Sequence, residues 1–320
     1  MSEMLKVSGL KKYFDVKDEA GEVIQLRAVD DVSFFIQEGE TIGLVGESGC
    51  GKSTIGKCLV RLYEPTAGEI LFRGVNITHL SRREMLAHRK DIQMIFQDPY
   101  SSLDPRMNVR ALISEGVRIQ RPDVARSAMD DLVESLMVSV GLSAEQMLRY
   151  PHEFSGGQRQ RIAIARALAV EPALIVCDEP VSALDVSVQA QVVNLLQKLK
   201  KERNVTYLFI SHDLRVVRHL SDRIIVMYLG NIMETARADD LFAQPVHPYT
   251  QMLLSAVPNT NPEEKREKLI MNGEIPGIDQ IPAGCRFCTR CPYADERCRS
   301  ERPGMLDLGN GHQVACFREC

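Results

Sequence analysis

The chain has 320 residues, 44% of them apolar and 26% charged, which is ordinary for a soluble globular protein of roughly two domains. Its formal net charge is −4 and no apolar run approaches about 18 residues, which argues against a basic nucleic-acid footprint and against a membrane span. The N-terminal sequence MSEMLKVSGLKKYF lacks the apolar stretch of a secretory signal, so we expect a cytoplasmic protein.

Short apolar runs alternate with helical segments along the chain. Strands are expected at Val32–Ile36, Thr41–Val45, Ile92–Phe96, Leu174–Cys177, Val205–Ile210 and Arg223–Met227. Helices are expected at Lys52–Leu62, over most of Met107–Val140, at Arg161–Leu168 and at Val186–Leu199. This alternation predicts an α/β fold with a largely parallel sheet. After Ala256 the sequence becomes rich in Pro, Gly and Cys, and Val257–Glu267 resembles a linker. We therefore divide the chain into residues 1–256 and 257–320.

A glycine-rich turn lies between an expected strand and an expected helix and matches the pattern G-x-x-x-x-G-K-[ST]. It consists of Gly46, Glu47, Ser48, Gly49, Cys50, Gly51, Lys52, Ser53 and Thr54. In such a loop the backbone N–H groups and the helix dipole bind phosphate oxygens. Lys52 would reach the β- and γ-phosphates, and the Ser53 hydroxyl would bind Mg²⁺. A surface turn is the alternative, but the strand and helix on either side favour nucleotide binding.

Two acids follow the apolar strand at 174–177. The C-terminal ends of parallel strands face the crevice in which open α/β sheets bind ligands. Asp178 would therefore contribute to the Mg²⁺ site, and Glu179 could act as general base toward an attacking water. A solvated strand end before Pro180 is the alternative.

A second anion site is expected at Ser155, Gly156, Gly157 and Gln158, where a hydroxyl and free N–H groups open a helix. One triphosphate does not need two such sites in one chain, so we infer that this one faces a partner's nucleotide. At this point the sequence, over about residues 1–250, resembles the ATP-binding cassette family. The resemblance implies a P-loop cassette with an antiparallel N-terminal sheet and a helical signature subdomain at about 100–170. Phe154 stands where leucine is commoner.

The same resemblance implies further site residues. Gln97 matches a lid glutamine that senses Mg²⁺ and water, and His212 matches a switch histidine that contacts the γ-phosphate. Asp185 ends the sequence Ser182–Asp185, which matches a loop crossing a dimer interface. Tyr13 is similar to the aromatic residue that stacks on adenine, with Phe14 as the alternative.

Several short sequences resemble those of bacterial oligopeptide and dipeptide importers. They are His247–Thr250, Leu253–Pro258, Ile275–Gly277, Pro282–Cys285 and Arg290–Ala294. Pro99–Arg106 is similar to the second of the two ATPase subunits of such importers. The resemblance implies a heterodimer with another ATPase subunit, two membrane permease subunits and an extracytoplasmic binding protein. The chain would then be peripheral at the cytoplasmic face of the inner membrane, with no nucleic-acid partner.

Six of the nine cysteines lie after residue 284, a clustering more typical of metal binding than of disulfides in a reducing compartment. Thiolates alone suit zinc or an iron–sulfur cluster, and metal-free thiols are a third alternative. The resemblance selects Cys285, Cys291, Cys298 and Cys316, which hold a [4Fe–4S] cluster in some relatives, and leaves out Cys288 and Cys320.

The remaining cysteines lie in the first part of the chain. Cys58 and Cys177 are expected to be small core residues. Cys50, inside the phosphate loop, is either a tolerated small side chain or a redox-sensitive thiol.

Two other functions are compatible with a cassette. One is a soluble ATPase acting on nucleic acid or ribosomes, which usually carries two cassettes or a long coiled-coil insertion. The other is a regulatory cassette that only binds nucleotide, which the presence of both Glu179 and His212 disfavours. The sequence therefore predicts an ATPase that energises a peptide-type importer.

Overall fold

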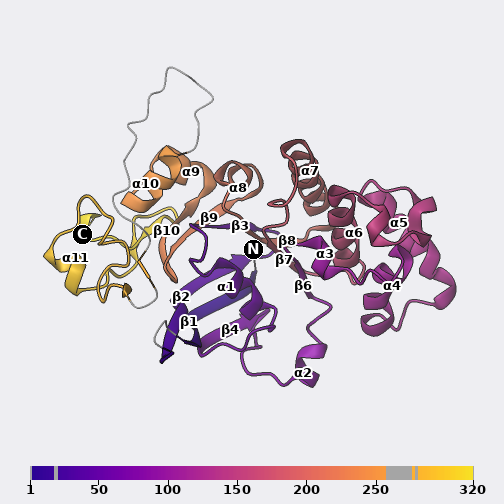
Figure 1. Ribbon diagram of the computed structural model, residues 1–320, viewed down its shortest axis with the longest axis horizontal. Helices are drawn as coiled ribbons and strands as arrows, with labels where there is room; N and C mark the ends of the chain where they lie inside the picture. Colours follow the sequence, from indigo (N-terminus) through magenta and orange to yellow (C-terminus); the bar gives the residue numbers. More distant parts are fainter. Residues whose placement is uncertain (1, 18–20, 257–275, 278–279, 320) are drawn as a thin grey trace, which may run out of the picture.

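The computed structural model describes residues 2–17, 21–256, 276–277 and 280–319 (Figure 1). It contains a four-stranded antiparallel sheet in the order β2-β1-β4-β5 and an eight-stranded mixed sheet in the order β11-β12-β10-β9-β3-β8-β7-β6. The first sheet consists of β1 (Glu3–Lys17), β2 (Val23–Gln37), β4 (Ala67–Phe72) and β5 (Val75–Asn76). The second consists of β3 (Thr41–Val45), β6 (Ile92–Ile95), β7 (Leu174–Asp178), β8 (Thr206–Ile210), β9 (Arg223–Tyr228), β10 (Asn231–Arg237), β11 (Leu306–Asp307) and β12 (Gln313–Val314).

The described α-helices cover the sheets and form one end of the molecule. They are α1 (Lys52–Leu59), α2 (Arg82–Leu86), α3 (Pro99–Ser102), α4 (Val109–Gln120), α5 (Met129–Ser139), α6 (Gly156–Leu168), α7 (Val186–Arg203), α8 (Leu214–Leu220), α9 (Ala238–Ala243), α10 (Pro248–Ser255) and α11 (Glu296–Ser300). Figure 1 shows α4, α5 and α6 together at one end and the C-terminal segment with α11 at the other. None of these helices is long and apolar enough to cross a membrane.

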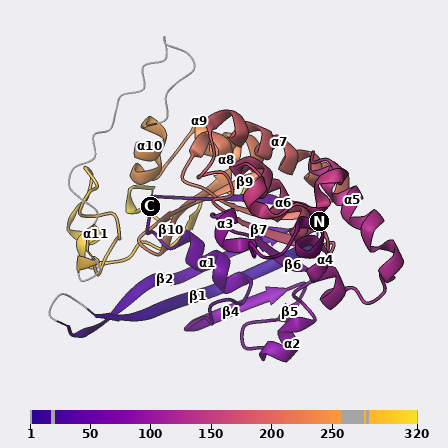
Figure 2. The ribbon, with the colours of Figure 1, turned by 45° about the vertical axis from the view of Figure 1, so that its right-hand side comes forward.

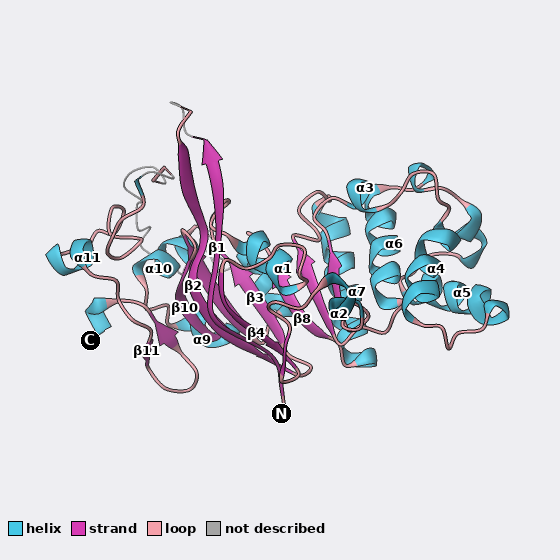
Figure 3. Cartoon of the chain, turned by 90° about the horizontal axis from the view of Figure 1, so that it is seen from below, coloured by secondary structure: helices cyan, strands magenta, loops and turns pink. Residues whose placement is uncertain are grey.

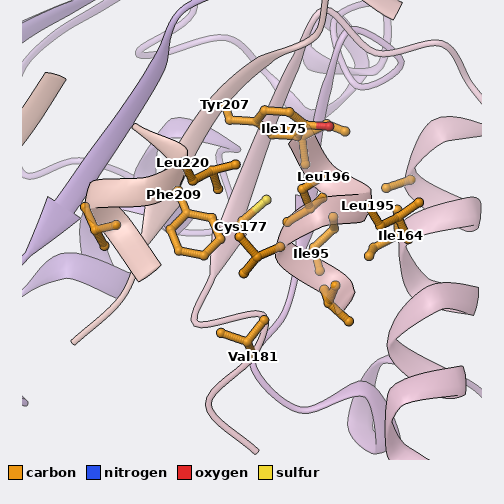
Figure 4. Close-up of a cluster of buried hydrophobic side chains, with 14 of the residues drawn as sticks. Ile95, Ile164, Ile175, Cys177, Val181, Leu195, Leu196, Tyr207, Phe209 and Leu220 are labelled. Carbon is orange, nitrogen blue, oxygen red and sulfur yellow. The ribbon is translucent and has the colours of Figure 1, made fainter. Parts of the chain in front are cut away.

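The predicted parallel sheet is confirmed by the run β9-β3-β8-β7-β6, in which every neighbouring pair is parallel. Side chains alternate between the faces of this sheet. Ile175 and Cys177 point into a core with α6, α7 and α8 (Figure 4), whereas Leu174 and Val176 belong to a second core with α1 and the antiparallel sheet. Both faces are covered, so the strands are continuously apolar, which is why they could be recognised in the sequence.

The antiparallel sheet is dominated by a long hairpin of β1 and β2 (Figure 2), which projects past the other strands in Figure 3. Its register runs from Glu3 opposite Gln37 to Lys17 opposite Val23. The sequence predicts a strand only at Val32–Ile36, because the start of β2 alternates exposed and half-buried positions and has no apolar run. The antiparallel sheet implied by the family resemblance is confirmed.

The described C-terminal segment joins the edge of the mixed sheet. Strand β12 pairs with β10, placing Val314 opposite Glu234. The Glu234 carboxylate is fully buried and accepts hydrogen bonds from the backbone N–H groups of Val246 and His247, and it also pairs with the His312 ring. The expected linker at 257–267 lies outside the described residues.

Candidate functional site

A cavity of about 430 Å³ lies between the glycine-rich loop and the β1–β2 hairpin. Its volume is within the range of small-molecule binding sites. The loop supplies Glu47, Ser48, Gly49, Cys50, Gly51, Lys52, Ser53 and Thr54, and other elements supply Phe14, Leu26, Arg27, Ala28, Gln97, Glu179, Tyr228, Leu229, Gly230, Pro276, Gly277 and Ile281. The cavity thus brings together residues that are far apart in the sequence.

Glycine is required where the loop turns into α1. Gly51, the N-cap of α1, has a φ of 103°, and a Cβ atom there would lie 2.1 Å from the carbonyl oxygen of Ala28. At Gly46 a Cβ atom would lie 2.2 Å from the Met227 carbonyl oxygen. No side chain caps the start of α1, so its first N–H groups remain available for an anion.

Lys52 is almost completely buried, with 4% of its surface exposed. Its ammonium donates hydrogen bonds to the carbonyl oxygens of Gly46 at 2.8 Å and Glu47 at 2.9 Å. Both acceptors are neutral, so the positive charge remains available to an anionic ligand in the loop. This arrangement suits the phosphate-binding role predicted for Lys52.

Two of the three residues predicted to bind Mg²⁺, Ser53 and Asp178, lie side by side, whereas the third, Gln97, is hydrogen-bonded to Glu179. The Ser53 hydroxyl donates to the Asp178 carboxylate at 2.6 Å, and burial raises the pKa of Asp178. A hydroxyl and a carboxylate supply the oxygen ligands that Mg²⁺ prefers, and a cation would relieve the penalty of keeping a buried carboxylate charged. These residues therefore fit the metal that accompanies ATP.

Three polar side chains meet at the end of β7. The Glu179 carboxylate accepts a hydrogen bond from Gln97 Nε2 at 3.1 Å and lies 3.3 Å from His212 Nδ1. The backbone of Glu179 has a φ of 46°, a left-handed conformation that is costly for a residue with a side chain and is found at active sites. The structure thus brings together the glutamine, the acid and the histidine that were predicted as catalytic residues.

The predicted signature residues do not line this cavity. Ser155 is the N-cap of α6 and exchanges hydrogen bonds with Gln158 in a capping box. Gly157 allows α6 to approach α7, because a Cβ atom there would lie 2.3 Å from Val188 Cγ1. Gly156 begins α6 beside Ser155. Ser155 is exposed, so this helix start lies at the protein surface, with the Gln158 N–H already hydrogen-bonded within the chain.

Asp185 is the exposed N-cap of α7, and the apolar side chain of the next residue, Val186, is 81% exposed. The loop Ser182–Asp185 therefore lies at the protein surface, next to an apolar side chain in contact with solvent.

Phe14, the alternative to Tyr13, is the aromatic residue of β1 in the cavity wall. The Tyr13 hydroxyl instead donates to the buried Asp30 carboxylate, and Tyr13 is not among the residues that line the cavity. Burial and this hydrogen bond raise the pKa of Tyr13 to about 12. We therefore expect Phe14 to contact the nucleobase.

The cysteines of the first part of the chain are buried. Cys58 and Cys177 are core residues, as predicted. Cys50 is 3% exposed, and burial raises its thiol pKa above the ordinary value. A raised pKa opposes the thiolate reactivity required of a redox-sensitive residue.

Five C-terminal cysteines surround one small cavity of about 20 Å³: Cys285, Cys288, Cys291, Cys298 and Cys316. Burial is the main cause that raises the pKa of Cys285 to about 12. Within the described ranges, no group of three or more His, Cys, Asp or Glu residues is arranged to hold a single metal ion. Cys320 lies outside those ranges.

Several contributors to the site have no local sequence signal. Arg27 and Ala28 line the cavity from β2, in a stretch that has no apolar run to identify it as a strand. Arg290 pairs with Glu47 across 243 residues of sequence, and nothing in the sequence around Arg290 indicates this partner.

Comparisons with known proteins identify the family of the chain. The family model of ABC transporters matches residues 29–182, and the family model of the oligopeptide/dipeptide transporter C-terminal region matches residues 233–298. The putative oligopeptide transport ATP-binding protein YkfD of Bacillus subtilis is 53% identical, covering 98% of this chain and 94% of the relative. The oligopeptide transport ATP-binding protein OppF of Haemophilus influenzae is 48% identical, covering 98% and 97%.

Among solved structures, the ATP-binding cassette MJ0796 bound to ADP and Pi matches with a TM-score of 0.66 and 29% identity, covering 73% of this chain and 99% of that one. CbiO1 of Clostridium perfringens, part of an ABC transporter complex, matches with a TM-score of 0.65 and 27% identity, covering 76% and 92%. The chain belongs to the ATP-binding subunits of ABC transporters, a family that hydrolyses ATP to power transport.

Proposed function

We propose that this chain binds and hydrolyses ATP to energise a membrane importer of dipeptides, oligopeptides or a related small solute. The observation that carries the proposal is the single cavity in which the phosphate loop, Gln97 and Glu179 meet. The relatives named as oligopeptide transport ATP-binding proteins support the peptide cargo.

In the proposed reaction, the loop N–H groups and Lys52 hold the triphosphate while Glu179 accepts a proton from the attacking water. Gln97 donates to the same carboxylate and so orients it. His212 lies beside it, where its ring can contact the γ-phosphate. Ser53 and Asp178 would hold Mg²⁺, whose charge would neutralise that of the β- and γ-phosphate oxygens.

A second ATPase subunit would complete the site. Ser155 and the start of α6 lie outside the cavity of their own chain, as expected if they bind the nucleotide of a partner. We propose a heterodimer, which co-purification of two differently tagged ATPase subunits would detect.

An apolar groove of about 480 Å³ beside Gln97 is our proposed docking site for a permease subunit. It lies between the β6 region and the helical end of the molecule, and its wall includes Leu62, Leu86, Phe96 and Ile119. Ile119 is 63% exposed and Leu62 48%. A short amphipathic helix would cover these side chains and contact the segment that carries Gln97.

The C-terminal cysteines are proposed to hold a [4Fe–4S] cluster through Cys285, Cys291, Cys298 and Cys316. The proposal rests on the chemistry of the set, since four cysteine thiolates are the usual ligands of such a cluster; these four are among the five thiols around one small cavity. Anaerobic purification followed by iron, sulfide and zinc analysis tests it. Stoichiometric zinc without iron, or neither metal, would refute it.

The deciding experiment is ATP hydrolysis by this chain reconstituted with its permeases, second ATPase and binding protein in vesicles. We expect the chain to fractionate with the membrane through the permeases and the peptide-loaded binding protein to stimulate hydrolysis. Lys52→Ala is the matched negative control, because it weakens ATP binding. Stimulation by RNA or ribosomes without any effect of peptide would favour the nucleic-acid alternative.

A further inference from the structure

An arginine from the C-terminal segment reaches into the phosphate loop. Arg290 forms a bidentate pair with the Glu47 carboxylate, with Nη1 at 2.7 Å from Oε2 and Nη2 at 3.1 Å from Oε1. Only 5% of the Arg290 side chain and 18% of the Glu47 side chain are exposed. Two parallel hydrogen bonds between ionised groups fix direction as well as distance, so the pair is a rigid connection.

Residue 47 is held at two further points. Its backbone N–H donates to the Tyr249 hydroxyl at 2.9 Å, and its carbonyl oxygen accepts from Lys52 at 2.9 Å. Tyr249 in turn lies against Tyr228 and Phe287, with ring centroids 4.7 Å and 5.3 Å away. The loop therefore rests on a buried aromatic cluster to which the C-terminal segment contributes Phe287.

The charge of Glu47 explains why such a contact matters. Glu47 lines the nucleotide cavity, so an unpaired carboxylate there would repel a triphosphate. Arg290 cancels this charge and holds both carboxylate oxygens. The same C-terminal segment also lines the cavity through Ile281.

We propose that Arg290 is a positioning residue for ATP, which neutralises Glu47 and fixes the phosphate loop so that the C-terminal segment completes the nucleotide site. The inference rests on the proposed function, because it concerns the affinity for the nucleotide that the chain hydrolyses. It assigns the C-terminal segment a direct effect on nucleotide binding.

Contacts other than that of Arg290 also anchor the C-terminal segment. Arg286 forms a buried ion pair with Asp30, and Arg302 contacts the same carboxylate at 3.0 Å. The pairing of β12 with β10 is a further attachment. We therefore expect the segment to stay in place when Arg290 is neutralised, which makes the proposal testable by substitution.

The test compares Arg290→Gln, Glu47→Gln and the double variant in the full chain, assembled with its partner subunits. Titration with a fluorescent ATP analogue and steady-state hydrolysis give Kd, KM and kcat. We expect Arg290→Gln to raise Kd and KM for ATP about tenfold while kcat stays within about twofold. The penalty should shrink as the KCl concentration rises, because it is a charge effect. Arg290→Lys, which keeps the charge but not the fork, should give a smaller increase.

The double variant separates charge pairing from simple support. It removes both charges, so we expect it to regain most of the affinity lost in Arg290→Gln. The matched control is Arg297→Gln, which removes an exposed arginine of the same segment that pairs with Glu301. Unchanged affinity in Arg290→Gln, or a double variant as weak as Arg290→Gln, would overturn the proposal. A wild-type complex that hydrolyses no ATP would instead refute the proposed function.

Discussion

Glu179→Gln removes one negative charge and keeps the shape of the side chain that meets Gln97 and His212. The amide can still accept a hydrogen bond from Gln97 Nε2, which lies 3.1 Å from the carboxylate. It cannot accept a proton from water. A general base contributes about 10²–10⁴ in rate, so we expect kcat to fall by this factor, equivalent to about 2.7–5.4 kcal/mol of transition-state stabilisation.

Binding of ATP should change little in this variant, because the phosphate loop and Lys52 are untouched. The assay is steady-state hydrolysis by the reconstituted complex, with ATP affinity measured in parallel by nucleotide titration. Glu202→Gln is the matched control, since Glu202 is exposed on α7 and pairs only at 3.8 Å with Lys198. A kcat for Glu179→Gln within about threefold of wild type, far less than the loss of a general base, would refute the assignment of the base.

Three more predictions concern the nucleobase, the loop and pH. Phe14→Ala should weaken ATP binding by about 1–3 kcal/mol, the cost of losing an aromatic–base stack. Tyr13→Phe should weaken binding less and mainly lower the melting temperature. The reverse order in nucleotide titrations would refute the placement of Phe14 at the nucleobase. Gly51→Ala should lower the free energy of unfolding, measured with denaturant, by at least about 2 kcal/mol, because a φ of 103° is strained for alanine and the new Cβ would lie 2.1 Å from the Ala28 carbonyl oxygen. A variant as stable as wild type would contradict this geometry. Burial lowers the pKa of His247 to about 4 in the folded protein. Between about pH 6.5 and 4 the unfolded chain therefore binds more protons than the folded one, so the free energy of unfolding should fall by at most about 3 kcal/mol as the pH drops through this range. His247→Asn keeps a capping side chain and should flatten this slope in urea melts, and an unchanged slope would exclude His247 as its source.

The phosphate loop and the acidic pair could be predicted because each follows a local rule, whereas Gln97 and His212 were identified only through the family resemblance. The phosphate loop needs glycine at fixed positions, and Asp178 and Glu179 end an apolar strand that is buried on both faces. The common direction of parallel strands then places such ends at one edge of the sheet. These are relations between near neighbours in sequence, so one sequence is sufficient to detect them.

The choice between Tyr13 and Phe14 illustrates a limit of such rules. Adjacent residues on a strand point to opposite faces, so a shift of one residue exchanges them. Strand β1 has a register irregularity between Lys12 and Tyr13. A bulge of this kind changes which face follows, and no local pattern in the sequence announces it. Only the folded hairpin places Phe14 in the cavity wall.

Contacts of the C-terminal segment were beyond sequence reasoning for a different reason. Strands β11 and β12 are two residues long each, too short to produce a periodic pattern. The local sequence does not show which arginines of the C-terminal segment are buried, yet Arg290 is buried against the phosphate loop and Arg297 is exposed. The partner of a charged residue depends on tertiary placement, which composition and spacing do not encode.

Buried ion pairs join the C-terminal segment to three other parts of the chain. Three acids outside it each meet a base from within it: Asp30 meets Arg286, Glu47 meets Arg290, and Glu234 meets His312. Removing one partner of a buried pair usually costs about 3–5 kcal/mol, because the remaining charge is left without compensation. The acids lie beside Tyr13, in the phosphate loop and in strand β10. Changes in the C-terminal segment should therefore reach the ATP site by altering charge as well as by altering packing.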